Sequence, residues 1–179
     1  MAKEVEQQWF VARTRAKQEK AIQERIESLG IQTYLPIRTE IRKWSDRKKK
    51  VDTVLVPNTI FIHASKKEAT GLHNEQGLAI NYLRDVTCEK PGAMLVVPDY
   101  QMESFMKFLE ITQGQYDVED ALIYRKGDHV IVTSGPLKGL IGELVRVDGK
   151  NKVVVRLGDL IACSVTLTTD EIEKVNDLV

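Results

Sequence analysis

The feature that most constrains the fold of this chain is a change of sequence pattern near residue 120. Before it, apolar residues recur at the spacing of helices as well as of strands. After it come short β-branched runs separated by glycine, at residues 129–133, 140–147, 153–157 and 160–167. Residues 113–120 between the two parts are acidic and lack periodicity. The pattern therefore predicts two domains, residues 1–113 and 124–179, joined by a linker at 114–123.

The first part predicts a mixed α+β domain with an antiparallel sheet. Residues 16–29 place Ile22, Ile26 and Leu29 on one helical face, before a Gly30 C-cap. A second helix is expected from an N-cap at Asp99. Strands are expected at 8–13, 31–36, 60–64 and 78–84, a hairpin at 37–44 and 51–56, and a weak helix or loop at 68–77. The whole chain is thus α+β, a sheet flanked by helices and then a small β-barrel.

The net charge of zero hides an uneven distribution along the chain. Residues 1–65 carry 13 Lys and Arg against 8 Asp and Glu, and seven of those bases lie in residues 38–50. Residues 124–179 have no basic excess. This segregation predicts a basic face for a polyanion in the first domain. It argues against a barrel that grips RNA and favours a protein partner for it.

Several classes of protein are disfavoured by what the sequence lacks. No apolar run approaches the roughly 18 residues of a membrane span, and the polar start has no signal-peptide core. Cys88 and Cys163 lie far apart and, with three scattered histidines, make no metal-ligand spacing. No nucleotide-binding glycine loop or catalytic constellation is found. We therefore expect a cytoplasmic non-enzyme with no catalytic residues, no metal and no cofactor.

Separate motifs resemble the NusG family of transcription elongation factors. Residues 126–145 look like a KOW motif, with Val130 and Val132 pointing inward and Gly142 allowing a close strand crossing. Residues 9–11 before a helix, and 34–36 after it, resemble the opening of the NusG N-terminal (NGN) domain. Residues 54–62 are similar to its core strand. The resemblance implies an NGN-like domain followed by an SH3-like KOW barrel.

Further details resemble specialised paralogues of the UpxY and RfaH-like kind more than housekeeping NusG. These are residues 44–49 and 97–105, together with Pro57 and Asn58. The resemblance implies an antiterminator that suppresses pausing and termination at particular, polysaccharide-type operons. Val56 and Thr59 replace the usual aromatic residues, so the family's aromatic contact with polymerase is partly absent.

The resemblance implies that the first domain docks on the clamp helices of RNA polymerase, beside the non-template DNA strand. The positions that match the polymerase-binding patch are Trp9, Arg13, Val56 and Phe61. For Phe61, a place in the core of a central strand is favoured over this contact. Trp9 can anchor a core, stack on a base, or do both from opposite edges.

Nucleic-acid contacts are expected from three groups of residues. The hairpin tip offers Arg47, Lys48, Lys49 and Lys50, which can contact phosphates or be an ordinary solvated turn. Arg15, Lys17 and Arg25 match positions near DNA in RfaH-like factors, with plain exposed charge as the alternative. His73 and Asn74 align loosely with a loop that touches DNA and the polymerase lobe opposite the clamp.

The partner of the KOW domain is carried over from the family as a ribosomal small-subunit protein or the termination factor Rho. Refolding of this domain into helices is disfavoured because its valine-rich runs strongly favour strands. Two other functions remain open at this point. One is a general NusG-like factor that couples polymerase to Rho or the ribosome, and the other is a ribosome-associated KOW protein that binds RNA.

Overall fold

The computed structural model describes residues 6–43, 48–74, 77–85, 92–113, 115–119, 127–147 and 149–175. The chain divides into two compact units. The first contains Val54–Asp99 and the chain up to Ile37, and the second contains Arg38–Thr53 and the chain from Tyr100 onward. Each unit is described by itself below.

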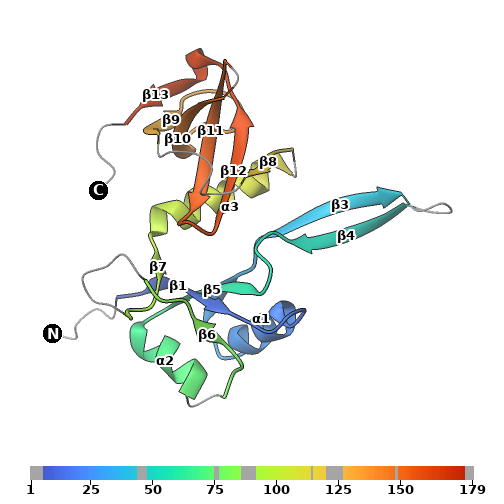
Figure 1. Cartoon of the computed structure of the whole chain (residues 1–179), viewed down its shortest axis with the longest axis vertical. Helices are drawn as coiled ribbons and strands as arrows, with labels where there is room; N and C mark the ends of the chain where they lie inside the picture. Colours follow the sequence, from blue (N-terminus) through green and yellow to red (C-terminus); the bar gives the residue numbers. More distant parts are fainter. Residues whose placement is uncertain are drawn as a thin grey trace. The chain divides into compact units, whose positions relative to one another are not determined.

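The first unit is built on an antiparallel sheet of short strands (Figure 1). Its order is β2 (Gln32–Tyr34), β5 (Thr59–Ala64), β1 (Gln8–Arg13) and β6 (Asn81–Tyr82), and β7 (Val96–Val97) also pairs with β1. The long central pair joins Gln8 to Ala64 and Arg13 to Thr59. Because β1 and β5 have partners on both edges, their backbone hydrogen bonds are largely satisfied within the sheet.

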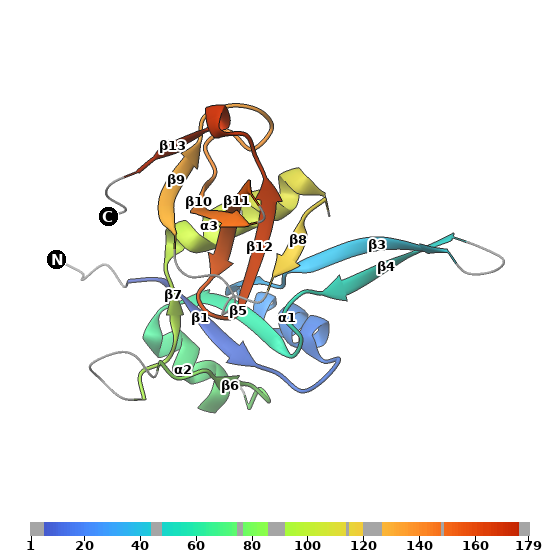
Figure 2. The same cartoon turned by 45° about the horizontal axis from the view of Figure 1, so that its top comes forward.

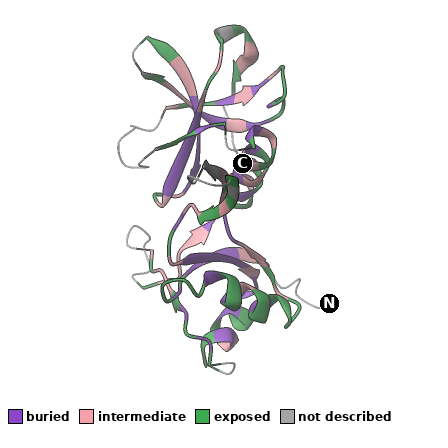
Figure 3. Ribbon diagram, turned by 90° about the vertical axis from the view of Figure 1, so that its right-hand side faces the viewer, coloured by how far each residue is buried: buried purple, intermediate pink, exposed green. Residues whose placement is uncertain are grey.

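Two helices belong to this unit, α1 (Glu19–Glu27) and α2 (Lys66–Asn74). Their apolar positions join a core cluster with alternate residues of the strands, among them Phe10 and Ile62. The outer faces of the helices are exposed, whereas the central strands are buried (Figure 3). A capping box starts α2: the Glu68 N–H donates to the Ser65 hydroxyl (3.2 Å), and the Ser65 N–H donates to the Glu68 carboxylate (2.8 Å).

The second unit contains a six-stranded antiparallel sheet that is typical of a small barrel. Its order is β13 (Ile172–Lys174), β9 (Asp128–Val132), β10 (Ile141–Val147), β11 (Lys150–Leu157), β12 (Ile161–Thr166) and β8 (Asp117–Glu119), with a 3₁₀ turn η1 at Thr169–Glu171. Val130 and Val132 are buried, as predicted. A Cβ on Gly142 would lie 2.7 Å from Val153 Cγ1, so the close crossing expected there is confirmed.

Helix α3 (Asp99–Thr112) and the hairpin of β3 (Ile37–Lys43) and β4 (Lys48–Val54) complete the fold. The Gly158 N–H donates to Gln101 Oε1 on α3 (3.1 Å), and Lys107 Nζ donates to the Lys138 carbonyl (3.0 Å). The two strands of the hairpin run as one ribbon in both views (Figure 2). The α+β fold class, with an antiparallel sheet and helices before an all-β region, is confirmed.

The structure differs from the sequence-based expectation in the segment taken as a linker. Within residues 114–123, Asp117–Glu119 form β8, an edge strand that pairs with β12. The division into units also has other bounds, because the hairpin and α3 group with the barrel. The first helix is shorter than expected, and the strand expected at 78–84 is reduced to Asn81–Tyr82. Among the described residues, no helix is long and apolar enough to cross a membrane.

Candidate nucleic-acid interface

Three of the expected basic residues lie close together in sequence at the end of β1 and in the loop between β1 and α1. Arg13, Arg15 and Lys17 are all exposed. Lys17 has a φ of 62°, and the Gln18 N–H donates to the Arg15 carbonyl (3.1 Å), so this loop makes a tight turn before the helix begins. We call residues 13–17 the basic loop. It presents three cations without an intervening acid, which suits a phosphate backbone.

The basic loop is held by the turn between β4 and β5. The Thr14 N–H donates to the Asn58 carbonyl (2.9 Å), and Arg13 Nη1 lies 3.5 Å from the Pro57 carbonyl. The Asn58 N–H in turn donates to Oε1 of Glu19, the first residue of α1 (2.9 Å). Sequence analysis did not single out Glu19. Its spacing of three and seven residues from Ile22 and Ile26 was the available indication, because it places a carboxylate on the buried helix face.

A second group surrounds a hollow of about 280 Å³ in the first unit. Helix α2 contributes the predicted His73 and Asn74, both exposed, together with Lys66 and Thr70. The opposite lining comprises Tyr82, Arg84 and residues 92–94. Lys66 and Arg84 were not predicted, since nothing in the sequence indicates that α2 and the segment around residue 84 meet. The structure thus adds two cations to the predicted pair.

Tyr82 gives this hollow part of its lining. Its ring lies edge-on to Phe10, with centroids 6.2 Å apart, and burial raises the pKa of its hydroxyl well above the ordinary value. Arg84 donates from Nη1 to the Gly92 carbonyl (2.6 Å). The neutral Tyr82 and the cations around it make a mixed apolar and positive surface, which suits nucleotides more than a simple anion.

The remaining predicted basic residues lie elsewhere. Lys48 and Lys50 are exposed on β4, Lys49 belongs to the same strand, and Arg47 lies outside the described residues. At the base of the hairpin, the Arg38 guanidinium lies over the Tyr116 ring, 5.1 Å from its centroid, and burial raises the pKa of Tyr116 to about 12. Arg25 is exposed in the last turn of α1, about 9 Å along the helix axis from Glu19.

The expected apolar polymerase patch is not an exposed surface in this structure. Trp9, Val56 and Phe61 are only 4%, 7% and 0% exposed. Trp9 stacks on His63, with ring centroids 4.8 Å apart, and Phe61 lies 6.5 Å from Tyr34. The physical reason is that the sheet is covered on both faces along β1 and β5. The core position favoured for Phe61 is therefore confirmed, and Arg13 alone of the four is exposed.

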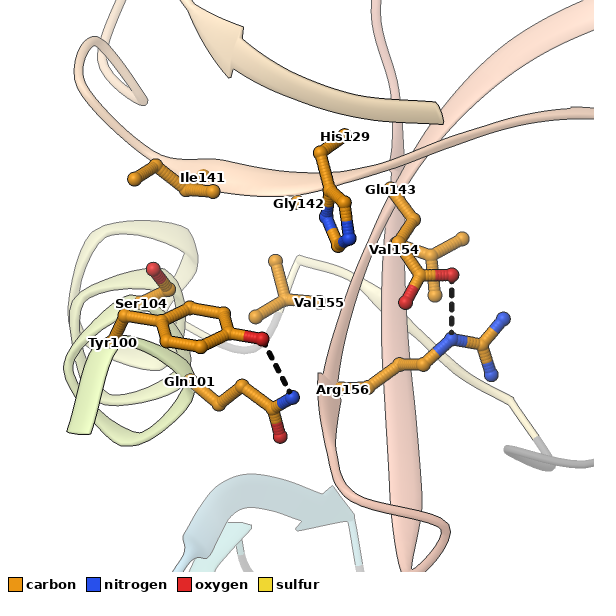
Figure 4. Close-up of a pocket in the computed structure, with 10 residues that line it drawn as sticks. All are labelled: Tyr100, Gln101, Ser104, His129, Ile141, Gly142, Glu143, Val154, Val155 and Arg156. Atoms are coloured by element: carbon orange, nitrogen blue, oxygen red, sulfur yellow. Dashed lines mark hydrogen bonds and ion pairs between the residues drawn. The ribbon is translucent and has the colours of Figure 1, made fainter. Parts of the chain in front are cut away.

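The second unit has a small hollow between α3 and the barrel strands (Figure 4). Its volume of about 30 Å³ is far below the several hundred Å³ of a typical ligand site. One wall carries the buried ion pair of Arg156 Nε with Glu143 Oε2 (3.0 Å), and the Gly127 N–H also points to that carboxylate (3.3 Å). Among the described residues, no group of His, Cys, Asp or Glu is arranged to hold a metal ion.

Comparison with known proteins assigns both parts of the chain. Residues 7–106 match the family model described as transcription termination factor nusG, and residues 126–156 match the KOW motif. No curated protein matches the chain. A solved structure described as "Domain interaction in Thermotoga maritima NusG" is 20% identical over 96% of this chain and 98% of that chain, with a TM-score of 0.42.

A second solved structure, described as "Crystal Structure of MjSpt4:Spt5 complex conformation B", is 19% identical over 94% of this chain and 97% of that chain, with a TM-score of 0.24. The family models carry the assignment, and the first of them alone covers more than half of the chain. The resemblance noted in the separate sequence motifs is thereby confirmed at the level of the family. The protein belongs to the NusG family of non-enzymatic transcription elongation factors, with an NGN domain and a KOW motif.

Proposed function

We propose that this protein is a specialised antitermination factor that binds RNA polymerase in the cytoplasm and contacts the non-template DNA strand. By doing so it suppresses pausing and termination at particular operons. The observation that carries the proposal is the exposed basic loop, fixed at the end of a central strand of the NGN sheet. No chemistry is required, because binding that favours the processive state of polymerase shifts the population toward it.

DNA contact is proposed first for the basic loop. Arg15 and Lys17 lie two residues apart on a tight turn whose start is hydrogen-bonded to Asn58. Each phosphate that such cations neutralise adds affinity and salt dependence. Arg25 and the hairpin bases Arg47 to Lys50 would extend the contact. His73 and Asn74, with Lys66 and Arg84 beside them, offer donors and a ring surface that could distinguish bases.

Contact with the polymerase clamp helices is proposed for the same sheet. Arg13 is exposed and available for it. Trp9, Val56 and Phe61 are buried here, so they can contribute only when that face of the sheet is uncovered. A partner that supplies apolar helices would then bury these large side chains, because an apolar surface is favoured over water as their surroundings.

A protein partner is proposed for the KOW barrel. Its residues carry no excess of positive charge, and the buried Arg156 is paired with Glu143 instead of being offered to phosphates. A ribosomal small-subunit protein or Rho fits this description. Tethering the barrel to a polymerase-bound NGN domain would raise its local concentration near that partner.

The test is whether the full-length protein binds an assembled elongation complex of its own RNA polymerase and changes read-through at a terminator. Increased read-through supports the antiterminator. Increased termination in the presence of Rho would replace it with the general NusG-like role. Absence of binding, together with salt-dependent binding to structured RNA, would replace it with the ribosome-associated alternative.

Replacing Arg15 and Lys17 with Gln should weaken engagement with the DNA-containing complex but leave binding to free polymerase unchanged. Loss of two contacts to single-stranded phosphates predicts that the negative slope of log K against log salt becomes shallower by about 1.4. Lys150→Gln, an exposed lysine of the barrel, is the matched control and should change neither. An unchanged slope in the double variant would remove the basic loop from the mechanism.

A further inference from the structure

Glu19 is buried beside the basic loop of the first unit. It is only 7% exposed, although it is charged and stands in the first turn of α1. The helix N-terminus favours an acid at this position, but an exposed acid would gain from the same dipole without the cost of burial. The burial therefore needs a further reason, and the hydrogen bond between Glu19 and Asn58 supplies it.

Asn58 connects the start of the basic loop to the first residue of the helix that follows the loop. At the start of the loop, the Thr14 N–H donates to the Asn58 carbonyl (2.9 Å), and at its end Glu19 Oε1 accepts from the Asn58 N–H (2.9 Å). Asn58 has a φ of 57°, the left-handed region that asparagine tolerates better than most residues. Asn58 thus uses both of its backbone polar groups to hold the segment that carries Arg15 and Lys17.

We propose that Glu19 is a positioning residue for nucleic-acid binding, acting through Asn58 to hold Arg15 and Lys17 at a fixed spacing. The inference rests on the DNA contact proposed for the basic loop. Loop ordering that is completed before binding does not have to be provided by the contact with the strand. The charge of Glu19 itself opposes a polyanion, so its contribution comes from its acceptor oxygen and not from its charge.

The charge of Glu19 should weaken DNA binding and its acceptor oxygen should strengthen it, so variants that separate the two effects test the proposal in the full-length protein. Binding is measured to a short single-stranded DNA of mixed sequence, over a series of salt concentrations. Glu24→Ala removes an exposed acid of the same helix and should raise affinity slightly, by about twofold or less. Glu19→Gln keeps a carbonyl oxygen for Asn58 and should bind at least as well as the wild type.

Glu19→Ala removes the acceptor as well as the charge. If Glu19 acted only through its charge, this variant would gain affinity as Glu24→Ala does. Positioning predicts the opposite, a loss of about tenfold. The negative slope of log K against log salt should also become shallower by about 0.7 for each phosphate contact that the loosened loop loses. Affinity and slope equal to those of Glu24→Ala would overturn the inference.

Variants of Asn58 keep the test decisive if Glu19→Ala fails to fold, which circular dichroism would detect. Asn58→Gly retains both backbone groups and the positive φ, so it should bind as the wild type does. Asn58→Val opposes that φ while leaving α1 intact, and it should reproduce the loss of affinity and slope. If the wild type binds DNA and Asn58→Val binds it equally well, the positioning role of Glu19 is overturned, whereas the proposed function is not. Absence of DNA binding by the wild type, alone and in the elongation complex, would overturn the proposed function instead.

Discussion

Among the residues that the structure describes, each unit buries one glutamate, and the two carboxylates are satisfied in different ways. Glu19 of helix α1 in the first unit accepts a hydrogen bond from the backbone N–H of Asn58 (2.9 Å). Glu143 of the barrel accepts one from the Arg156 guanidinium (3.0 Å) and receives the Gly127 N–H as well. The carboxylate of Glu143 therefore has a buried charge as its partner, whereas the carboxylate of Glu19, on helix α1, binds a neutral backbone turn.

The two partners indicate different roles for the two acids. The Glu143–Arg156 pair joins β10 to the neighbouring β11 within the sheet, so its consequences stay inside the barrel. Glu19 instead connects a helix to a turn and a loop that are open to solvent, so its consequences reach a surface. Burial of an acid alone would not have distinguished these roles, since their exposed fractions are similar at 7% and 9%.

The largest expected effect is on the barrel. Glu143→Ala leaves the buried Arg156 without its carboxylate partner and should lower the free energy of unfolding by about 3 kcal/mol. Urea denaturation of the full-length chain followed by circular dichroism measures it. A fall in single-stranded DNA binding by the folded variant would contradict a role for Glu143 that is confined to the barrel.

A paired replacement of Glu143 and Arg156 serves as the control for that experiment. Glu143→Leu with Arg156→Met removes both charges together and should lie within about 1 kcal/mol of the wild type. A double variant as unstable as Glu143→Ala would show that the pair is not the reason for the loss.

A smaller loss of DNA affinity is expected from changes in the hairpin. Among the described residues, its lysines are not held by backbone hydrogen bonds like those that Asn58 makes beside the basic loop. Changing Lys48 and Lys50 to Gln should reduce affinity for the elongation complex several-fold, and only at moderate salt. Lys150→Gln again serves as the control. A loss of affinity as large as that of the Arg15 and Lys17 double variant would mean that the hydrogen bonds holding the basic loop add nothing to its phosphate contacts.

The smallest expected effect is a change in stability at low pH, and it comes from Glu68. This exposed glutamate accepts a hydrogen bond from a backbone N–H, as Glu19 does. The Ser65 hydroxyl, followed by the Ser65 backbone N–H, lowers the pKa of Glu68 below 4.5. A group whose pKa is lower in the folded state stabilises it above the unfolded pKa, and loses this as pH falls through the folded value. Stability should therefore decline slightly below pH 4.5, and less in Glu68→Gln. Identical pH profiles of the thermal midpoint for the two proteins would contradict this.

Much of the fold could be predicted because the spacing of apolar residues shows which face of a helix or strand is buried. The strand at residues 8–13 appears with those bounds, and the turn before Thr59 is also found. The sequence predicts only a weak helix or a loop at residues 68–77 because the apolar pattern there is short, although Ser65 and Glu68 have the spacing of a capping box. β8 could not be predicted, because Asp117–Glu119 is a strand only through pairing with β12.

The candidate site was predictable only in part, for a similar reason. Arg13, Arg15 and Lys17 are close together in the sequence, so their combined positive charge can be recognised without the structure. Lys66 and Arg84 become neighbours only when α2 and the segment after β6 come together. The burial of Trp9 and Phe61 on an otherwise plausible contact face likewise depends on what the sheet packs against, which no local pattern contains.

The strand β8 also determines where the chain can be cut. A fragment that begins at residue 124 omits Asp117–Glu119, and this exposes the edge of β12 along Ala162, Cys163 and Ser164. Unpaired strand edges recruit other strands, so such a fragment is expected to self-associate. The chain also passes between the two compact units three times, at residues 37, 53 and 99. Expression of the KOW part alone should therefore begin ahead of Gln115, and a single protease cut cannot release one intact unit from the other.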